Sequence, residues 1–241
     1  MIGEWRLLLS GPCDPPLNMA IDEAILRLTR RDGVSPTLRL YTWNPPALSI
    51  GYFQDSASPA IAEWLARGYP LTRRPTGGLA VLHKDEMSYS IVGFCGRDGF
   101  PANGREAYRR AHESIVKALI KLGFDVDVLR DDKPAWTDGL CSSSWFLYDI
   151  ILAKKGKIGG SAQRRVGSTL LQHGSLALPG QLDQGRLTEE VAKGFGEVFG
   201  VKLCEQQLTD EELSLAEELV RGKYGTWEWN YKGRFLSLRR N

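Results

Sequence analysis

The sequence lacks the features that mark several specialised classes of protein. Its 241 residues carry 31 Lys and Arg against 29 Asp and Glu, a net charge of +2, so bulk charge does not indicate a nucleic-acid-binding protein. Long apolar runs are also missing, because the three consecutive leucines of "WRLLLSG" are too few for a signal peptide or a membrane span. We therefore expect a cytoplasmic protein that binds neither nucleic acid nor membrane.

Cysteine is scarce, and its spacing excludes two common uses. The four cysteines are far apart and form no CxxC pair; they are Cys13, Cys95, Cys141 and Cys204. This spacing argues against a disulfide framework and against a zinc site, and we predict no metal site. In a reducing compartment they are free thiols, so each is either a core residue or a nucleophile.

Hydrophobic periodicity predicts one α+β domain over 1–241. The alternating segments predict strands, and residues 37–43 and 47–54 are expected to pair with each other, whereas residues 146–178 are expected to form a three-stranded meander. Helical spacing is clear in 15–31, with Asn18 as a cap, and in 105–124. The sheet is predicted to be mixed, mainly antiparallel and flanked by helices, with a helical C-terminal subregion over 181–241. Thr209 and Glu212 have the spacing of a capping box.

The stretch "RRPTGG", residues 73–78, has two interpretations. Gly77 and Gly78 permit positive φ and a close approach of backbone N–H groups to a ligand, and Arg73 and Arg74 would favour an anion there. A plain hairpin turn between strands explains the same letters. The spacing is not that of a phosphate-binding P-loop.

A second stretch, "KIGGSAQRR" at residues 157–165, also has two interpretations. The small residues after Lys157 leave room for a ligand against the backbone, and a lysine there could place positive charge on a carbonyl oxygen or a phosphate. A basic surface strand accounts for the same residues.

Four further side chains are candidates for chemistry. His83 and His173 are each more typical of a hydrogen-bonded structural histidine than of a catalyst, and His112 is expected to be a solvated helix residue. Cys141 lies outside any apolar run, in a predicted loop, where a thiol near Lys or Arg can act as a nucleophile. Taken alone, it is more often a bystander.

Three motifs together resemble one family. "RRPTGGLAVLH", "GKIGGSAQRR" and "LQHGSLAL" occur in the order and spacing of the biotin/lipoate protein ligase superfamily, and nearly all of the chain is similar. Within it, the chain most resembles Cys-dependent lipoyl octanoyltransferases and single-domain lipoate–protein ligases. The resemblance implies a mixed sheet flanked by helices, with the acyl chain in a tunnel.

The resemblance also implies a task and a set of site residues. The task is amide formation between an octanoyl or lipoyl group and one lysine of a lipoyl-domain protein, such as the glycine-cleavage H protein or a 2-oxoacid dehydrogenase subunit. Lys157 and Cys141 become the implied catalytic residues. The implied substrate-binding residues are Arg73, Arg74, Pro75, Thr76, Gly77, Gly78, His83, Gly160, Ser161, Ala162, Gln163, His173 and Gly174.

Two chemistries remain open within this resemblance. A transferase takes octanoate as a thioester from acyl carrier protein, holds it on Cys141 and needs no cofactor. A ligase uses ATP and Mg²⁺ to make an acyl-adenylate, and there the arginine pair and Lys157 would offset phosphate charge. We favour the transferase because of Cys141 and the C-terminal helices, and we expect a monomer.

Overall fold

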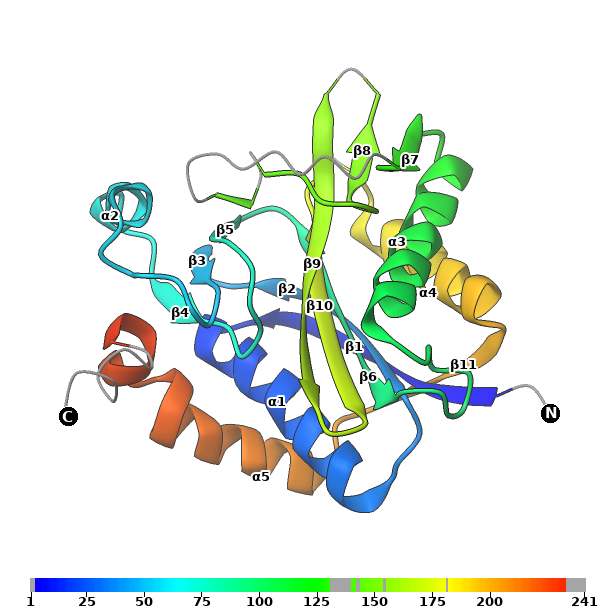
Figure 1. Cartoon of the computed structure of the whole chain (residues 1–241), viewed down its shortest axis with the longest axis horizontal. Helices are drawn as coiled ribbons and strands as arrows, with labels where there is room; N and C mark the ends of the chain where they lie inside the picture. Colours follow the sequence, from blue (N-terminus) through cyan, green and yellow to red (C-terminus); the bar gives the residue numbers. More distant parts are fainter. Residues whose placement is uncertain (1–2, 131–139, 142–143, 154, 181, 233–241) are drawn as a thin grey trace.

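A large mixed sheet forms the centre of the structure (Figure 1). The computed structural model describes residues 3–130, 140–141, 144–153, 155–180 and 182–232. From edge to edge, the eight strands are β11 (Val201–Gln206), β1 (Gly3–Cys13), β2 (Thr37–Trp43), β6 (Met87–Phe94), β10 (Thr169–Leu176), β9 (Gly156–Val166), β8 (Ile150–Leu152) and β7 (Val126–Val128). β1 runs parallel to β11 and to β2, and every pairing from β2 to β7 is antiparallel. The predicted mixed, mainly antiparallel sheet and its β8–β10 meander are confirmed.

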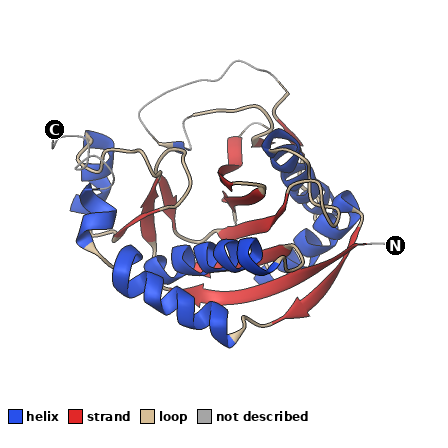
Figure 2. Cartoon of the chain, turned by 60° about the horizontal axis from the view of Figure 1, so that its bottom comes forward, coloured by secondary structure: helices blue, strands red, loops and turns tan. Residues whose placement is uncertain are grey.

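Two pairs of helices cover the two faces of this sheet (Figures 1 and 2). One face packs against α3 (Gly104–Lys121) and α4 (Gln184–Phe199), and the other against α1 (Pro15–Asp32) and α5 (Asp210–Leu219). Because successive strand side chains point to opposite faces, Leu7 joins the first core and Leu8 the second. No helix in the described part of the chain is long and apolar enough to cross a membrane.

A small second sheet corrects one predicted pairing. Its three strands are β4 (Leu71–Arg73), β3 (Ala47–Ile50) and β5 (Val81–His83), and α2 (Pro59–Ala66) packs against it. The prediction that residues 37–43 and 47–54 pair with each other is wrong. β2 already has β1 on one edge and β6 on the other, so it has no edge left for β3.

The C-terminal region is less purely helical than predicted. β11 lies within it and extends the central sheet beside β1. α5 begins at the predicted capping box of Thr209 and Glu212, which is confirmed. Glu212 also accepts a hydrogen bond of 2.7 Å from Arg6, so this acidic helix is tied to the first strand. Two short π-helical segments, η2 (Val220–Tyr224) and η3 (Glu228–Lys232), follow.

Two polar residues of the helices are buried, contrary to prediction. Asn18 does not cap α1, whose N-cap is Asp14. It lies inside the helix, where its Oδ1 accepts a hydrogen bond of 2.6 Å from Arg39 of β2. His112 is 0 % exposed rather than solvated, and its Nδ1 donates to the Tyr148 carbonyl at 2.6 Å. Its Nε2 is buried and has no hydrogen-bond partner among the described residues.

Burial of His112 predicts a loss of stability in mild acid. Burial lowers the pKa of His112 to about 4, against 6.5 in an unfolded chain. Between these values the unfolded chain binds a proton that the folded chain refuses, so the free energy of unfolding falls as the pH drops from 6.5 towards 4. The full shift corresponds to about 3 kcal/mol. In His112→Asn, whose amide can still donate to Tyr148, we expect this part of the pH dependence to be absent.

Urea denaturation of both proteins at intervals from pH 7.5 to 4.5 measures the difference. Only the change in the free energy of unfolding with pH is compared, so a constant destabilisation of the variant does not matter. Parallel curves for the two proteins would contradict the prediction.

Candidate active site

A cavity of about 60 Å³ lies where the central sheet meets the small sheet. Strands β9 and β10, the loop after β4, strand β5 and helix α3 all contribute to it. The residues that line it are Met19, Tyr41, Trp43, Arg74, Gly78, Leu79, Val81, His83, Ser88, Tyr108, Cys141, Phe146, Lys157, Gly160, Ser161, Ala162, His173, Gly174 and Ser175. Both implied catalytic residues are therefore in the wall of one cavity.

Lys157 holds the centre of this wall. Its side chain is only 4 % exposed, and its ammonium lies 2.8 Å from Oδ2 of Asp149. The same Nζ donates to Sγ of Cys141 at 3.2 Å and to the Ser144 carbonyl at 2.8 Å. These three acceptors match the three N–H donors of an ammonium. Lys157 is thus a fixed, fully bonded cation in contact with a thiol.

Asp149 is held as firmly as the lysine it binds. Its Oδ1 accepts a 2.5 Å hydrogen bond from the Tyr108 hydroxyl, and its Oδ2 accepts one of 2.8 Å from the Phe146 amide. Burial, with a further contribution from the nearby Asp149 charge, raises the pKa of Tyr108 well above its usual value, so the hydroxyl remains a donor. Asp149 follows Tyr148, which has a φ of +69°. Strained backbone of this kind is concentrated at functional sites.

Cys141 is brought to the site by a short contact with the small sheet. Its backbone N–H donates to the carbonyl of Ala80 at 2.9 Å, and Leu140 forms a parallel bridge with the same residue. The side chain is half-buried. An ammonium at 3.2 Å stabilises negative charge on the sulfur, which is the arrangement of a reactive rather than an inert cysteine.

Arg73, the first arginine of "RRPTGG", does not line the cavity. Its guanidinium donates to five backbone carbonyl oxygens, which belong to Gly51, Tyr52, Gln54, Trp229 and Asn230. These carbonyls come from the loop after β3 and from the C-terminal segment. Arg73 therefore ties the end of the chain to the small sheet, and its donors are used within the fold.

Arg74 lines the cavity, but its terminal nitrogens are also occupied. Nη1 donates to the carbonyl and hydroxyl oxygens of Ser49 at 3.0 and 2.6 Å. Nη2 donates to the carbonyls of Gly77 at 3.1 Å and Leu79 at 2.8 Å. Burial lowers the pKa of Arg74 to about 10. Arg74 thus holds the two sides of the glycine loop together through the carbonyls of Gly77 and Leu79. Gly78, with a φ of +86°, allows the turn between them.

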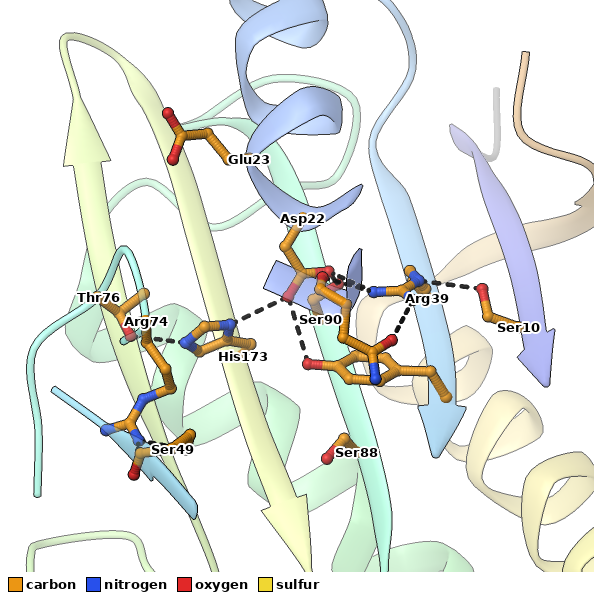
Figure 3. Close-up of polar contacts among 12 residues, drawn as sticks. Ser10, Asp22, Glu23, Arg39, Ser49, Arg74, Thr76, Ser88, Ser90 and His173 are labelled. Atoms are coloured by element: carbon orange, nitrogen blue, oxygen red, sulfur yellow. Dashed lines mark hydrogen bonds and ion pairs between the residues drawn. The ribbon is translucent and has the colours of Figure 1, made fainter. Parts of the chain in front are cut away.

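A buried polar chain supports this loop from behind (Figure 3). Nδ1 of His173 lies 3.0 Å from Oδ2 of Asp22, and Arg39 donates to Oδ1 of the same carboxylate at 2.9 Å. Nε2 of His173 lies 2.6 Å from the hydroxyl of Thr76. Burial lowers the pKa of His173, so the ring is neutral, with its proton on Nδ1 facing the carboxylate and Nε2 accepting from Thr76. Asp22 therefore positions the loop through His173.

His83 begins a second polar chain at the cavity. Its Nε2 lies 2.6 Å from the Ser49 hydroxyl, and its Nδ1 contacts Oε1 of Glu86. The ring stacks on Trp43 with a centroid separation of 3.9 Å. Because Arg74 already donates to the same hydroxyl, Ser49 turns its own proton towards His83. His83 then carries its proton on Nδ1 and donates it to Glu86.

Two glycines of the site are needed for packing as well as for space. A Cβ on Gly160 would lie 2.9 Å from Cε of Lys157, and a Cβ on Gly174 would lie 2.5 Å from the carbonyl oxygen of Gly160. Larger residues at these positions would displace Lys157 or separate β9 from β10. The small residues after Lys157 thus let the lysine fold back along its own strand, in addition to leaving room for a ligand.

The structure divides the predicted site residues into two groups. Those that line the cavity are Arg74, Gly78, His83, Cys141, Lys157, Gly160, Ser161, Ala162, His173 and Gly174. Those that do not are Arg73, Pro75, Thr76, Gly77 and Gln163. Gln163 instead donates to the carbonyl of Gly104 at the start of α3.

Sequence reasoning missed several residues of the wall. Tyr108 belongs to the apolar stripe of a helix and is typical of a core residue. Trp43 and Phe146 belong to apolar strand patterns and give no local sign of a cavity. Asp149, the carboxylate that binds Lys157, lies within the apolar stretch "FLYDIILA", which predicts a strand and gives no local sign of this role.

A thiol and a fixed ammonium in the wall of one cavity are the groups that an acyltransferase uses as nucleophile and as oxyanion stabiliser. Comparison with known proteins identifies the family. The chain belongs to the lipoyl protein ligase A/B catalytic domain family, whose profile matches residues 14–198. A curated relative named octanoyltransferase LipM, from Kyrpidia tusciae, is 38 % identical over 272 aligned residues, which cover 95 % of this chain and 98 % of that protein.

Solved structures confirm the predicted fold. A lipoate-protein ligase A bound with ATP superposes with a TM-score of 0.79 at 26 % identity, covering 95 % of this chain and 98 % of that one. A bi-partite lipoate protein ligase from Thermoplasma acidophilum, described with its E2 lipoyl domain, gives a TM-score of 0.73 at 25 % identity over 95 % of this chain and 96 % of that one. The predicted superfamily is confirmed as well.

The contact between Lys157 and Cys141 predicts a reactive thiol. In Lys157→Met, which keeps the stem and removes the charge, we expect alkylation of Cys141 by iodoacetamide at pH 7 to slow about tenfold or more. Lys155→Met changes an exposed lysine two residues before Lys157. It is the matched control, and its Cys141 should be alkylated at the rate of the parent protein.

Peptide mass spectrometry measures the labelling rate at each cysteine separately. The half-buried Cys13, Cys95 and Cys204 serve as internal references, since their rates change if the fold is disturbed. Equal labelling of Cys141 in Lys157→Met and in the parent would show that the ammonium does not activate the sulfur.

Proposed function

We propose that this chain moves an octanoyl group from a thioester donor to one lysine of a lipoyl-domain protein, through a thioester on Cys141. The observation that carries the proposal is the 3.2 Å contact between Sγ of Cys141 and Nζ of Lys157. The octanoyltransferase relative supports it, because the alignment with that protein covers 95 % of this chain and 98 % of the relative.

In the first step the Cys141 thiolate attacks the carbonyl carbon of the donor thioester. A new C–S bond forms, the bond to the donor sulfur breaks, and the donor thiolate takes a proton from water. Lys157 already lies beside the attacking sulfur, so its ammonium is placed to stabilise the oxyanion of the tetrahedral intermediate. Once the sulfur is acylated, the N–H that pointed at it is available to the carbonyl oxygen.

In the second step the acceptor lysine attacks the thioester on Cys141. The neutral amine forms the amide bond, the C–S bond breaks, and the departing sulfur takes the proton that the nitrogen loses, which leaves Cys141 as a thiol. The oxyanion of this step forms on the carbonyl oxygen of the thioester, as in the first step, and Lys157 again stabilises it. Asp149 and Tyr108 touch neither reactant in this scheme; they keep the ammonium in place for both steps.

The ligase alternative fits the described residues less well. An acyl-adenylate carries a phosphate, and the resemblance assigned Arg73 and Arg74 to offset its charge. Both terminal nitrogens of each guanidinium already donate to groups of the protein, mostly backbone carbonyls. The donors of Lys157 are occupied too, but one of its three partners is the Cys141 sulfur, which the transferase reaction would acylate. A neutral thioester makes a smaller demand on such a site than a phosphate does.

The acyl chain belongs in the cavity beneath the glycine loop. Its wall includes the aromatic rings of Tyr41, Trp43 and Phe146 beside Met19. The cavity, at about 60 Å³, is small for an eight-carbon chain, so we propose that the loop at Gly78 and Leu79 moves outwards when the octanoyl group binds.

The partners follow from this chemistry. The proposed donor is octanoyl-acyl carrier protein, and the proposed acceptors are the glycine-cleavage H protein and 2-oxoacid dehydrogenase subunits. A transferase of this kind needs neither ATP nor a metal ion. Its proposed location is the cytoplasm, where it would act as a monomer.

A donor assay tests the proposal. We expect the mass of an apo-lipoyl domain to rise by one octanoyl group with octanoyl-acyl carrier protein and no ATP. Cys141→Ser should lower the rate at least 10³-fold because an alcohol is a far weaker nucleophile at neutral pH. The parent protein should also accumulate an octanoyl thioester on Cys141 when the acceptor is left out.

Two results would contradict the proposal. One is product formation only with octanoate and ATP, which belongs to a ligase. The other is a parental rate in Cys141→Ser.

A further inference from the structure

A second cavity, of about 140 Å³, also reaches the catalytic pair. Cys141, Lys157, Gly160 and Ser175 line both cavities, so the thiol and the ammonium stand between two chambers. The second chamber is comparable in size to an apolar cavity of about 150 Å³ that binds benzene. It can hold a slender side chain but not a domain.

Beyond the Cys141, Lys157 and Ser175 side chains that it shares with the first cavity, the second cavity has a mainly apolar wall with one carboxylate. Trp64, Leu82, Leu140 and Ala177 give it a surface suited to methylene groups, and Glu86 is its acidic group. Glu86 is only 7 % exposed. A nearly buried carboxylate is unfavourable unless it is paired or hydrogen-bonded, so its partners indicate what it is for.

The hydrogen bonds of Glu86 occupy one of its two oxygens. Oε1 accepts from Nδ1 of His83, and it lies 3.4 Å from the donating hydroxyl of Ser88. The chain from Arg74 through Ser49 fixes His83 as the donor in this pair. Oε2 accepts no hydrogen bond from the described residues. The carboxylate is therefore held by one oxygen while the other can meet a donor in the cavity.

We propose that Glu86 is the general base of the transfer step and that the second cavity receives the side chain of the acceptor lysine. This inference rests on the function proposed above. A lysine ammonium cannot attack a thioester, and with a pKa near 10.4 fewer than about one lysine in a thousand is neutral at pH 7. Lys157 cannot remove the proton, because it is itself the cation that the oxyanion needs.

Charge decides which reactant takes this chamber. The acceptor lysine brings four methylenes, which match the apolar wall, and an ammonium, which matches Glu86. An octanoyl tail has no hydrogen-bond donor and would offer nothing to the second oxygen of Glu86. The arm of a thioester donor is uncharged next to the reacting sulfur and would leave it without a counter-charge. The acceptor lysine satisfies both features of the cavity.

The step balances in atoms and charge. The ammonium of the acceptor gives one proton to the Glu86 carboxylate and becomes a neutral amine. The amine forms a C–N bond to the thioester carbon, and the C–S bond breaks. The second proton of the attacking nitrogen goes to the departing sulfur, which leaves Cys141 as a thiol. The products are an amide, a neutral Glu86 and a neutral Cys141, and Glu86 then returns its proton to water.

The two half-reactions can be measured separately on the whole protein. Octanoyl-acyl carrier protein loads Cys141 in the absence of acceptor, the acyl-enzyme is desalted, and apo-lipoyl domain or hydroxylamine is added in single turnover. For Glu86→Gln we expect loading within about threefold of the parent and transfer to the lipoyl domain slower by roughly 10²–10³-fold. Hydroxylamine is neutral at pH 7 and needs no base, so it should remove the octanoyl group equally from both proteins.

The pH dependence supplies a readout that a structural role would not give. Without the base, transfer by Glu86→Gln should rise about tenfold per pH unit between pH 6.5 and 8.5, as the neutral fraction of the acceptor grows. The parent should respond less steeply. Asp85→Asn removes the neighbouring exposed carboxylate and is the matched control, expected to behave like the parent.

Each other outcome overturns the inference in a recognisable way. Parental transfer by Glu86→Gln would show that Glu86 is not the base. Slow loading together with slow hydroxylamine release would assign Glu86 to the fold, and slow loading with normal transfer would assign the cavity to the donor arm. Failure of the parent itself to form an acyl-enzyme would instead refute the proposed function.

Discussion

The buried ion pair of Lys157 and Asp149 sets the geometry on which the rest of the site depends. Two charges with side-chain exposures of 4 % and 0 % are expensive to remove from water, and they are stable only with further hydrogen bonds in place. Tyr108 and the Phe146 amide supply these on the acidic side, and Cys141 and Ser144 on the basic side. The thiol is thus one of the groups that completes the solvation of a buried ammonium.

Buried charged residues also hold the loop at Gly77 and Gly78, which covers the cavity. Arg73 and Arg74 donate to backbone carbonyls on both sides of the glycine loop and within it, which helps this short irregular segment to keep a single shape. Asp22 and His173 hold the loop from the opposite side through Thr76. The resulting support is polar, whereas the wall facing the acyl group is mostly apolar and aromatic. The polar contacts can keep the loop rigid, while the apolar wall can adapt to a ligand. This combination is compatible with the proposed outward movement of the loop as a unit on acyl binding.

Local sequence patterns predicted most of the strands and helices, but they could not predict contacts between residues that are far apart in the sequence. Alternation located β9 and β10, and the family resemblance implied that Lys157 and Cys141 belong to one site. The arginines were interpreted as anion ligands because a sequence shows their charge and not their acceptors; Arg73 meets carbonyls 156 or 157 positions away. Glu86 follows two charged residues in "HKDE" and is typical of an exposed turn. In the structure it is buried in the wall of a cavity whose other residues include Trp64, Leu140 and Ala177, which lie far from it in the sequence.

Net charge explains why a site of this construction favours a covalent acyl intermediate. Lys157 stabilises negative charge on the Cys141 sulfur, but Asp149 already offsets the lysine charge, so the thiolate form leaves these three groups with a net negative charge in a poorly hydrated space. Acylation converts that sulfur into a neutral thioester and relieves the cost. The second step would have to form that buried negative charge again if the sulfur of Cys141 left as a thiolate. A base that removes one proton from the acceptor, with the sulfur taking the other, lets the second step end with no added charge in the interior. In the proposed reaction, the two cavities would therefore separate the neutral acyl chain from the one reactant that arrives charged.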